Sequence, residues 1–139
     1  MLGVASKSGN PGAADPVESA SGRVAAVVAC FPPSDLTTFG TPERLSEFPA
    51  LNFDAKRYPD YSPIRFASSD DPPTLIVHGD RDSEVPIEQG RSMHEALTAA
   101  GASTEFIVIE GAGHGFRASN ADRAAAEMVS WFERHLRGR

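Results

Sequence analysis

The sequence lacks several features that would define a class of protein. Cys30 is the only cysteine among its 139 residues, so no internal disulfide can form. No apolar run has the length of a membrane-spanning helix. Acidic residues outnumber basic ones and give a net charge of −6, whereas nucleic acids and anionic membrane surfaces attract a basic face. We therefore expect one small domain with neither a nucleic-acid nor a membrane partner.

Ligand patterns for a metal ion are missing as well. The four histidines have no cysteine partners and no ligand spacing, so we expect no metal site. The acidic residues Asp70, Asp71, Asp80 and Asp82 fit turn chemistry better than a cation site. The segment from Met1 to Ala14 has one Lys and no apolar stretch, so no signal peptide is visible and the localisation stays open.

Three short apolar runs predict β-strands, and they span Arg23–Phe31, Pro72–Gly79 and Thr104–Glu110. The first two runs show no polar alternation, which is typical of strands that are buried on both faces. Such strands belong to parallel sheets that are covered by helices. Cys30 lies inside the first run and is expected to be an inert core residue.

Two further segments have the pattern of helices. Ile87–Ala100 carries an apolar stripe and is followed by Gly101, a residue that often ends helices. The last helix is expected to begin near Ser119 or Asn120, because either residue is a good N-cap. Its predicted apolar side consists of Ala121, Ala125, Met128, Phe132 and Leu136. Strands that alternate with helices predict an α/β fold with parallel strands.

The remaining segments are less regular. Residues 1–22 are rich in Gly, Ser, Pro and Ala and predict a helix remnant followed by a flexible loop, which leaves residues 23–139 as the folded domain. From Thr37 to Asp60, aromatic residues stand between prolines and charges, which indicates an excursion over a surface or a pocket. The aromatic residues either line a substrate pocket or pack in the ordinary way, and the sequence leaves both open.

Two loops could carry chemistry. The first, His78–Pro86, follows one predicted strand, and the second, Gly111–Phe116, follows the next. Ligands of parallel sheets bind beyond the carboxyl ends of strands, so both loops belong to one edge of the sheet. A carboxylate from the first loop and the imidazole of His114 can meet there. An aspartate in such a contact fixes the tautomer of the histidine and stabilises the imidazolium when the histidine takes up a proton.

These motifs resemble the C-terminal half of an α/β-hydrolase. The resemblance rests on the acid after His78-Gly79, the following Val85-Pro86 and the Gly-x-Gly-His-Gly-Phe loop, in that order. It covers nearly the whole chain from Arg23 and is strongest to the esterase/lipase and prolyl-oligopeptidase-like branches. The Phe31–Leu36 turn and the Tyr61-Ser-Pro63 segment are also similar to that group. The resemblance implies three parallel strands with flanking helices.

The same resemblance implies catalytic roles for two residues, with Asp82 as the triad acid and His114 as the general base. Asp80 is the alternative for the acid, and Asp82 would then serve as a turn or cap residue. His114 could also be a structural loop histidine, although the glycines around it let the backbone bring the ring into a site. No cofactor is required by this chemistry.

The nucleophile of the family is not found in the sequence. That nucleophile is a Ser in Gly-x-Ser-x-Gly, and no Ser here has Gly at both positions. The Met1–Ser6 segment resembles the stretch beyond the nucleophile helix of such relatives, so the chain is expected to begin just past that helix. We therefore expect part of a serine hydrolase of small-molecule esters or peptides, inactive alone because it lacks the serine and the oxyanion hole. The alternative is a non-catalytic α/β binding or assembly module, and a further variant has a separate chain supplying the nucleophile.

The order of strands carries one more expectation. In the order typical of the family, Leu75–Val77 lies in the middle of the sheet and the strand at Val24–Cys30 forms an edge. That edge has the apolar sequence of a central strand, without the charges or bulges that protect natural edges. We expect a fold of marginal stability that associates with itself through this edge.

Overall fold

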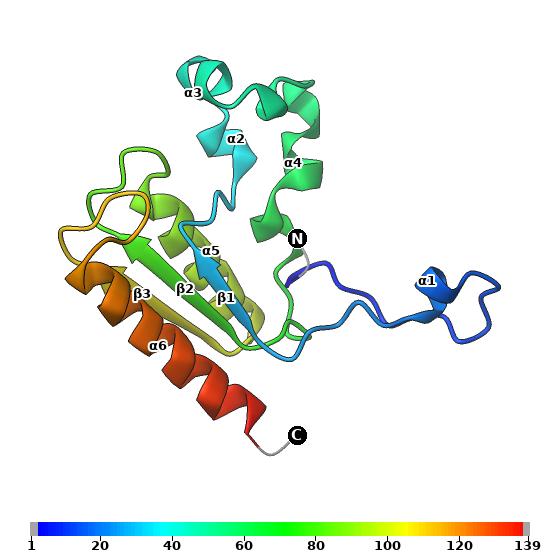
Figure 1. Ribbon diagram of the computed structural model, residues 1–139. Coiled ribbons are helices and arrows are strands. Elements are labelled where there is room, and N and C mark those ends of the chain that lie inside the picture. Colours follow the sequence, from blue (N-terminus) through cyan, green and yellow to red (C-terminus); the bar gives the residue numbers. More distant parts are fainter. Residues whose placement is uncertain (1–2, 138–139) are drawn as a thin grey trace.

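The computed structural model describes residues 3–137, apart from the side chain of Leu45, and contains a three-stranded parallel sheet (Figure 1). The strands are β1 (Val27–Cys30), β2 (Thr74–Gly79) and β3 (Thr104–Ile109), in the order β1-β2-β3. The predicted fold and the central place of β2 are thus confirmed. Met1 and Leu2, which open the segment compared with the family's post-nucleophile stretch, lie outside the described residues.

Burial differs between the three strands. Every residue of β2 is buried, whereas β1 is only half-buried along its length. The prediction of burial on both faces is therefore right for β2 and wrong for β1, because β1 has a neighbouring strand on one side only among the described residues. The ladder also begins at Val27 rather than Arg23. The strand that pairs with β1 is β2, and it is preceded by Pro72 and Pro73. Because proline has no backbone N–H to donate, these two residues do not extend the ladder.

Helix α5 (Ile87–Ala100) covers one face of the sheet and has the predicted bounds. Its Met93 and Leu97 pack with Ile76 of β2 in one buried cluster. The helix ends at Gly101, whose φ of +86° lies in the left-handed region that glycine adopts without strain. Side chains alternate along a strand, so Leu75 and Val77 point to the opposite face.

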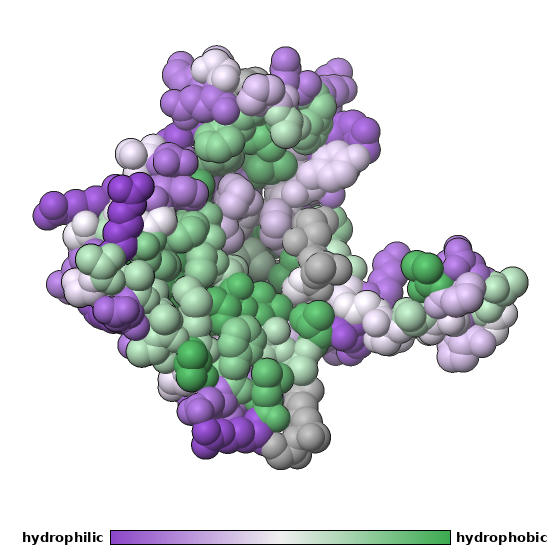
Figure 2. All heavy atoms as spheres, in the orientation of Figure 1, coloured by the Kyte–Doolittle hydropathy of each residue, from purple (hydrophilic) through white to green (hydrophobic). Residues whose placement is uncertain are grey.

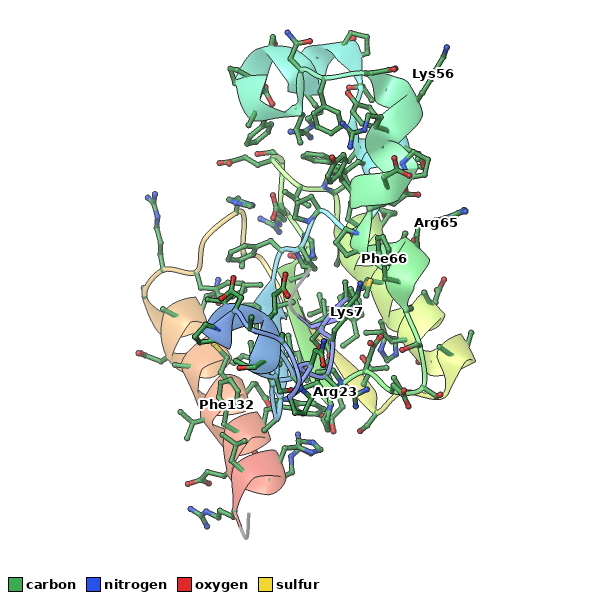
Figure 3. The ribbon with its side chains drawn as sticks, turned by 90° about the vertical axis from the view of Figure 1, so that its right-hand side faces the viewer. Lys7, Arg23, Lys56, Arg65, Phe66 and Phe132 are labelled. Carbon is green, nitrogen blue, oxygen red and sulfur yellow. The ribbon has the colours of Figure 1, made fainter. Side chains whose placement is uncertain are left out.

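That opposite face is covered by helix α6 (Ser119–Leu136). Trp131 and Ala124 are buried there against Leu75 and Val77. The predicted apolar side of α6 is wrong in phase: Phe132 (labelled in Figure 3) and Leu136 are 37% and 44% exposed. Trp131 is the largest fully buried side chain, and its burial turns the helix so that residues 124 and 131 face the sheet. Figure 2 shows hydrophobic side chains gathered over β1 and the neighbouring part of α6.

Helix α6 begins at Ser119, as predicted, but its N-cap differs from the prediction. Neither Ser119 nor Asn120 caps the helix, because the N-cap is Ala118, which makes no side-chain hydrogen bond. Ala118 has φ +50° and ψ −133°, a backbone conformation that residues with a Cβ rarely adopt. Among the described residues, no helix combines the length and apolarity needed to cross a membrane.

The segment between β1 and β2 forms an excursion of short helices, residues 36–66. It consists of α2 (Leu36–Phe39), α3 (Pro42–Glu47), η1 (Pro49–Leu51), η2 (Ala55–Arg57), α4 (Tyr58–Tyr61) and η3 (Pro63–Phe66). Figures 1 and 3 show it standing beyond the carboxyl end of the sheet, with Lys56 extending outward from it. The prediction of an irregular segment is thus replaced by helices of three to six residues, which are too short to give a periodic pattern.

Hydrogen bonds hold the two ends of the excursion together. The Leu36 N–H donates to Ser62 Oγ (2.9 Å), and the Ile64 N–H donates to the Ser34 carbonyl (3.0 Å). The Asp35 N–H donates to Gln89 Oε1 on the first turn of α5 (2.8 Å). These bonds place the excursion beside the carboxyl end of β2.

The amino-terminal segment, residues 3–22, contains one helix and no strand. This helix is α1 (Pro16–Ser19), and it projects from the body in Figure 1.

Candidate active site

Two loops meet at the carboxyl edge of the sheet, one after β2 and one after β3. The Arg81 N–H donates to the Ala112 carbonyl (2.9 Å), and the Gly111 N–H donates to Asp80 Oδ1 (2.6 Å). Gly79 makes this approach possible, because a Cβ at that position would lie 2.2 Å from the Ala112 oxygen. The sheet and these bonds therefore fix the two loops against each other.

Asp82 and His114 form the central contact of this edge. His114 Nδ1 lies 2.9 Å from Asp82 Oδ2, so the predicted meeting of these two side chains is confirmed. Asp80, the alternative acid, instead accepts the Gly111 N–H on the far side of its loop.

The Asp82 carboxylate is fully buried and is held by several donors. Its Oδ1 accepts the backbone N–H groups of Glu84 (2.9 Å) and Val85 (2.8 Å), while Oδ2 accepts from His114. Burial acts to raise the pKa of Asp82, but the hydrogen bonds from Val85, His114 and Glu84 together outweigh it and hold that pKa below its ordinary value. Asp82 is therefore an ionised acceptor at neutral pH.

His114 presents its other nitrogen to the surroundings. Because an ionised carboxylate only accepts, Nδ1 carries the proton and Nε2 of the neutral ring has a free lone pair. The side chain is 31% exposed, and Nε2 lies 3.8 Å from the Glu84 carboxylate. The ring packs against Phe31, with centroids 4.6 Å apart. Gly115 adopts φ +89°, a conformation that allows the sharp turn beside the histidine.

An apolar pocket of about 330 Å³ opens beside His114. We call it the apolar pocket, and its walls include Phe31, Phe39, Phe48, Leu51 and Val85. Phe31 has φ +42°, an unusual conformation for a bulky residue and one that is often found at functional sites. The aromatic residues of the excursion thus line a pocket and also pack together, so the two alternatives left open by the sequence are not exclusive.

Cys30 and Arg44 also contact the site. Cys30, expected to be an inert core residue, is half-buried at the wall of the apolar pocket, and burial raises the pKa of its thiol. Arg44 was not found by sequence reasoning. Its guanidinium donates to the Ser83 carbonyl (2.9 Å) and lies over the Phe39 ring, so it ties α3 to the loop that carries Asp82. No local pattern marks such a contact between distant residues.

Within residues 3–137, no group of three or more His, Cys, Asp or Glu side chains is placed to hold a metal ion.

The fold and the site together define the chain as part of an α/β-hydrolase: a parallel sheet has an acid after one strand and a histidine after the next. Residues 17–139 match the prolyl oligopeptidase family, and the chain belongs to that family.

Curated relatives carry both esterase and peptidase names. The chain is 36% identical to esterase LipC of Mycobacterium tuberculosis over 109 residues, covering 71% of this chain and 27% of that protein. It is 32% identical to the uncharacterized peptidase YuxL of Bacillus subtilis over 87 residues, covering 60% of this chain and 13% of that protein. The similarity therefore spans only a minor part of each of these relatives.

Solved structures give the same result. An acetyl ester-xyloside bifunctional hydrolase from Caldicellulosiruptor lactoaceticus superposes with a TM-score of 0.82 at 28% identity, covering 95% of this chain and 50% of that chain. A puromycin-hydrolyzing peptidase of Mycobacterium tuberculosis superposes with a TM-score of 0.69 at 25% identity, covering 81% of this chain and 18% of that chain. The predicted relation to esterases and prolyl-oligopeptidase-like hydrolases is confirmed, and the chain spans half or less of these structures.

Proposed function

We propose that this chain supplies the general base and the orienting acid of a serine hydrolase that cleaves an ester or peptide bond. The observation that carries the proposal is the 2.9 Å contact between His114 Nδ1 and the buried Asp82 carboxylate, in a histidine whose side chain is 31% exposed. His114 is the general base and Asp82 orients it.

The proton follows a simple path in this mechanism. Nε2 of His114 takes the proton of a serine hydroxyl as the serine oxygen attacks the substrate carbonyl. The positive imidazolium is stabilised by Asp82, which stays ionised because its pKa lies below the ordinary value. Nε2 then returns the proton to the leaving alcohol or amine, and the acyl group remains on the serine. A water molecule next gives a proton to Nε2 and attacks the acyl-enzyme, and the acid product leaves as the serine regains its proton. This chemistry requires no cofactor.

The nucleophile and the oxyanion donors lie outside these 139 residues in this proposal. The support is the sequence, which has no Gly-x-Ser-x-Gly pattern. Among the hydrogen bonds of residues 3–137, none joins His114 to a serine hydroxyl. We therefore expect the isolated chain to be inactive, because loss of the nucleophile removes the covalent route.

The apolar pocket favours a substrate with an apolar group next to the scissile carbonyl. Its volume of about 330 Å³ lies at the lower end of small-molecule sites, which run from about 300 Å³ to 1,000 Å³. Small esters and short peptides fit this size. Several relatives have esterase or peptidase in their names, which supports the same two classes without choosing between them.

A non-catalytic α/β binding module is the second candidate, and the missing Gly-x-Ser-x-Gly pattern favours it. In that case the Asp82–His114 pair is a structural relic of the fold. The test starts from the coding sequence upstream of Met1. If an in-frame Gly-x-Ser-x-Gly is present, the longer protein is expected to react with a fluorophosphonate at that serine. His114→Gln should then reduce ester hydrolysis by about 10⁶-fold.

The isolated chain is the control for this experiment. It should neither react with the fluorophosphonate nor hydrolyse a p-nitrophenyl ester. An upstream sequence without the pattern, together with no labelling of the full-length product, would replace the hydrolase proposal with the binding module. Labelling of one defined serine within residues 1–139 would instead show that the nucleophile is present here.

A further inference from the structure

His78 lies directly behind the Asp82–His114 pair, at the end of β2. Its side chain is fully buried. Nε2 is 2.9 Å from the Val85 carbonyl and 3.4 Å from Asp82 Oδ2. Both of these oxygens are acceptors, so the proton of the neutral ring is on Nε2 and points between them.

Hydrogen bonds close a small ring around the carboxylate. The Val85 N–H donates to Asp82 Oδ1, the Val85 carbonyl accepts from His78, and His78 Nε2 also faces Asp82 Oδ2. A carboxylate held at one oxygen by the Val85 and Glu84 N–H groups can still rotate about its χ angles. The histidine behind it limits that rotation and leaves Oδ2 facing His114 Nδ1.

Gly90 supplies a second, independent observation. This glycine lies inside helix α5, where glycine is a poor helix former. A Cβ at that position would lie 2.7 Å from His78 Nδ1 and 3.1 Å from the Phe106 ring. Nδ1 is buried and has no hydrogen-bond partner, so a proton there would have no acceptor. The site therefore fits one tautomer of His78 in one orientation.

We propose that His78 is a positioning residue for the Asp82–His114 pair. It fixes the Asp82 carboxylate so that Oδ2 accepts the hydrogen bond from His114 Nδ1–H, and it thereby sets which nitrogen of His114 is free to accept a proton. The inference deepens the proposed function and rests on it, because orientation of His114 matters only if Nε2 transfers a proton. The alternative is that His78 fills space at the end of β2 and has no influence on the pair.

The test measures the tautomer of His114 in the full 139-residue chain. Long-range ¹H–¹⁵N NMR correlations at about pH 8, above the ordinary histidine pKa near 6.5, report which ring nitrogen carries the proton. In the wild type we expect the Nδ1–H form for His114 and the Nε2–H form for His78. His78→Met removes the Nε2–H donor and puts an apolar side chain of similar length in its place. This variant should shift the His114 tautomer ratio about tenfold toward Nε2–H.

Three further variants complete the design. His78→Gln places an N–H near the position of Nε2 and should restore most of the wild-type ratio. Gly90→Ala keeps His78 but presses on its ring, so it should shift the ratio in the same direction as His78→Met although alanine is the better helix former. His94→Gln alters a histidine that contacts Thr104 on the amino-terminal side of β3, and it should leave the ratio unchanged.

The possible outcomes separate the two proposals. Folding of each variant is checked from its backbone amide spectrum. A folded His78→Met or Gly90→Ala variant with the wild-type ratio at His114 would overturn the positioning role and leave the proposed function intact. A wild type in which His114 lacks the Nδ1–H form would overturn the Asp82–His114 pair itself and the positioning role with it.

Discussion

Replacing Asp82 by Asn tests the electrostatics of the site in a measurable way. The Asn side-chain oxygen still accepts the N–H groups of Glu84 and Val85, but its amide nitrogen is a donor, so His114 Nδ1 can bond to it only as an acceptor, in the Nε2–H tautomer. Hydrogen bonds to a charged acceptor contribute about 1.5–3 kcal/mol and those to a neutral acceptor about 0.5–1.5 kcal/mol. The three bonds are therefore weakened by about 1 kcal/mol each.

The loss is partly offset by desolvation. The Asp82 carboxylate is fully buried, and taking a charge out of water costs several kcal/mol, which the neutral amide largely avoids. We expect the free energy of unfolding to fall by about 2 kcal/mol at pH 7 as the net result. Urea unfolding followed by circular dichroism measures it, with linear extrapolation to zero denaturant.

The stability difference between the wild type and Asp82→Asn should depend on pH, and the pKa of Asp82 sets the direction of this dependence. The pKa of Asp82 is lower in the folded chain than its ordinary value, so the wild type binds fewer protons when folded than when unfolded. Its advantage over Asp82→Asn is complete above the ordinary Asp pKa of about 3.9 and disappears as the pH falls through the lower folded value. Equal stabilities at pH 7, or a difference that stays the same at pH 2–3, would refute the reasoning.

Three further predictions concern the scaffold. Ala118→Gly should raise the free energy of unfolding by about 1 kcal/mol, because glycine adopts φ +50° without strain; a destabilised variant in urea unfolding would contradict the strained cap. Trp131→Ala should cost about 3–5 kcal/mol and Phe132→Ser less than about 1 kcal/mol, measured in the same way; similar losses would mean that α6 is turned differently. Self-association through β1 is expected because its outer edge has no neighbouring strand among the described residues; light scattering after size-exclusion chromatography tests it, and a stable monomer at high concentration would count against it.

The sheet and the central contact could be predicted because they depend on local patterns and one rule of topology. The buried run at Thr74–Gly79 and the stripe of Ile87–Ala100 each identify one element with its approximate bounds. Parallel strands bring their carboxyl ends to the same edge, so the contact between Asp82 and His114 followed from their positions after neighbouring strands.

The features that were missed depend on contacts between distant segments. The phase of α6 is set by the burial of Trp131 against β2, a contact that the sequence of the helix alone does not specify. Ala118 takes the N-cap position although better capping residues follow it, and it does so in a backbone conformation that no local sequence pattern indicates. The reach of Arg44 to the Ser83 carbonyl joins residues that are far apart in the sequence.

The mutual anchoring of the two loops at the sheet edge has a consequence for how such a protein can change. Asp80 and Arg81 lock the loop after β2 to the loop after β3, and both loops continue directly from strands. The excursion contributes Phe39, Phe48, Ala50 and Leu51 to the apolar pocket. It contacts the loop after β2 through Arg44, which donates to the Ser83 carbonyl, and through apolar side chains that pack against Val85. We therefore expect the distance between Asp82 and His114 to stay the same when residues 36–66 are lengthened, shortened or exchanged. Under the proposed function, such changes would alter substrate preference and leave the geometry of proton transfer as it is.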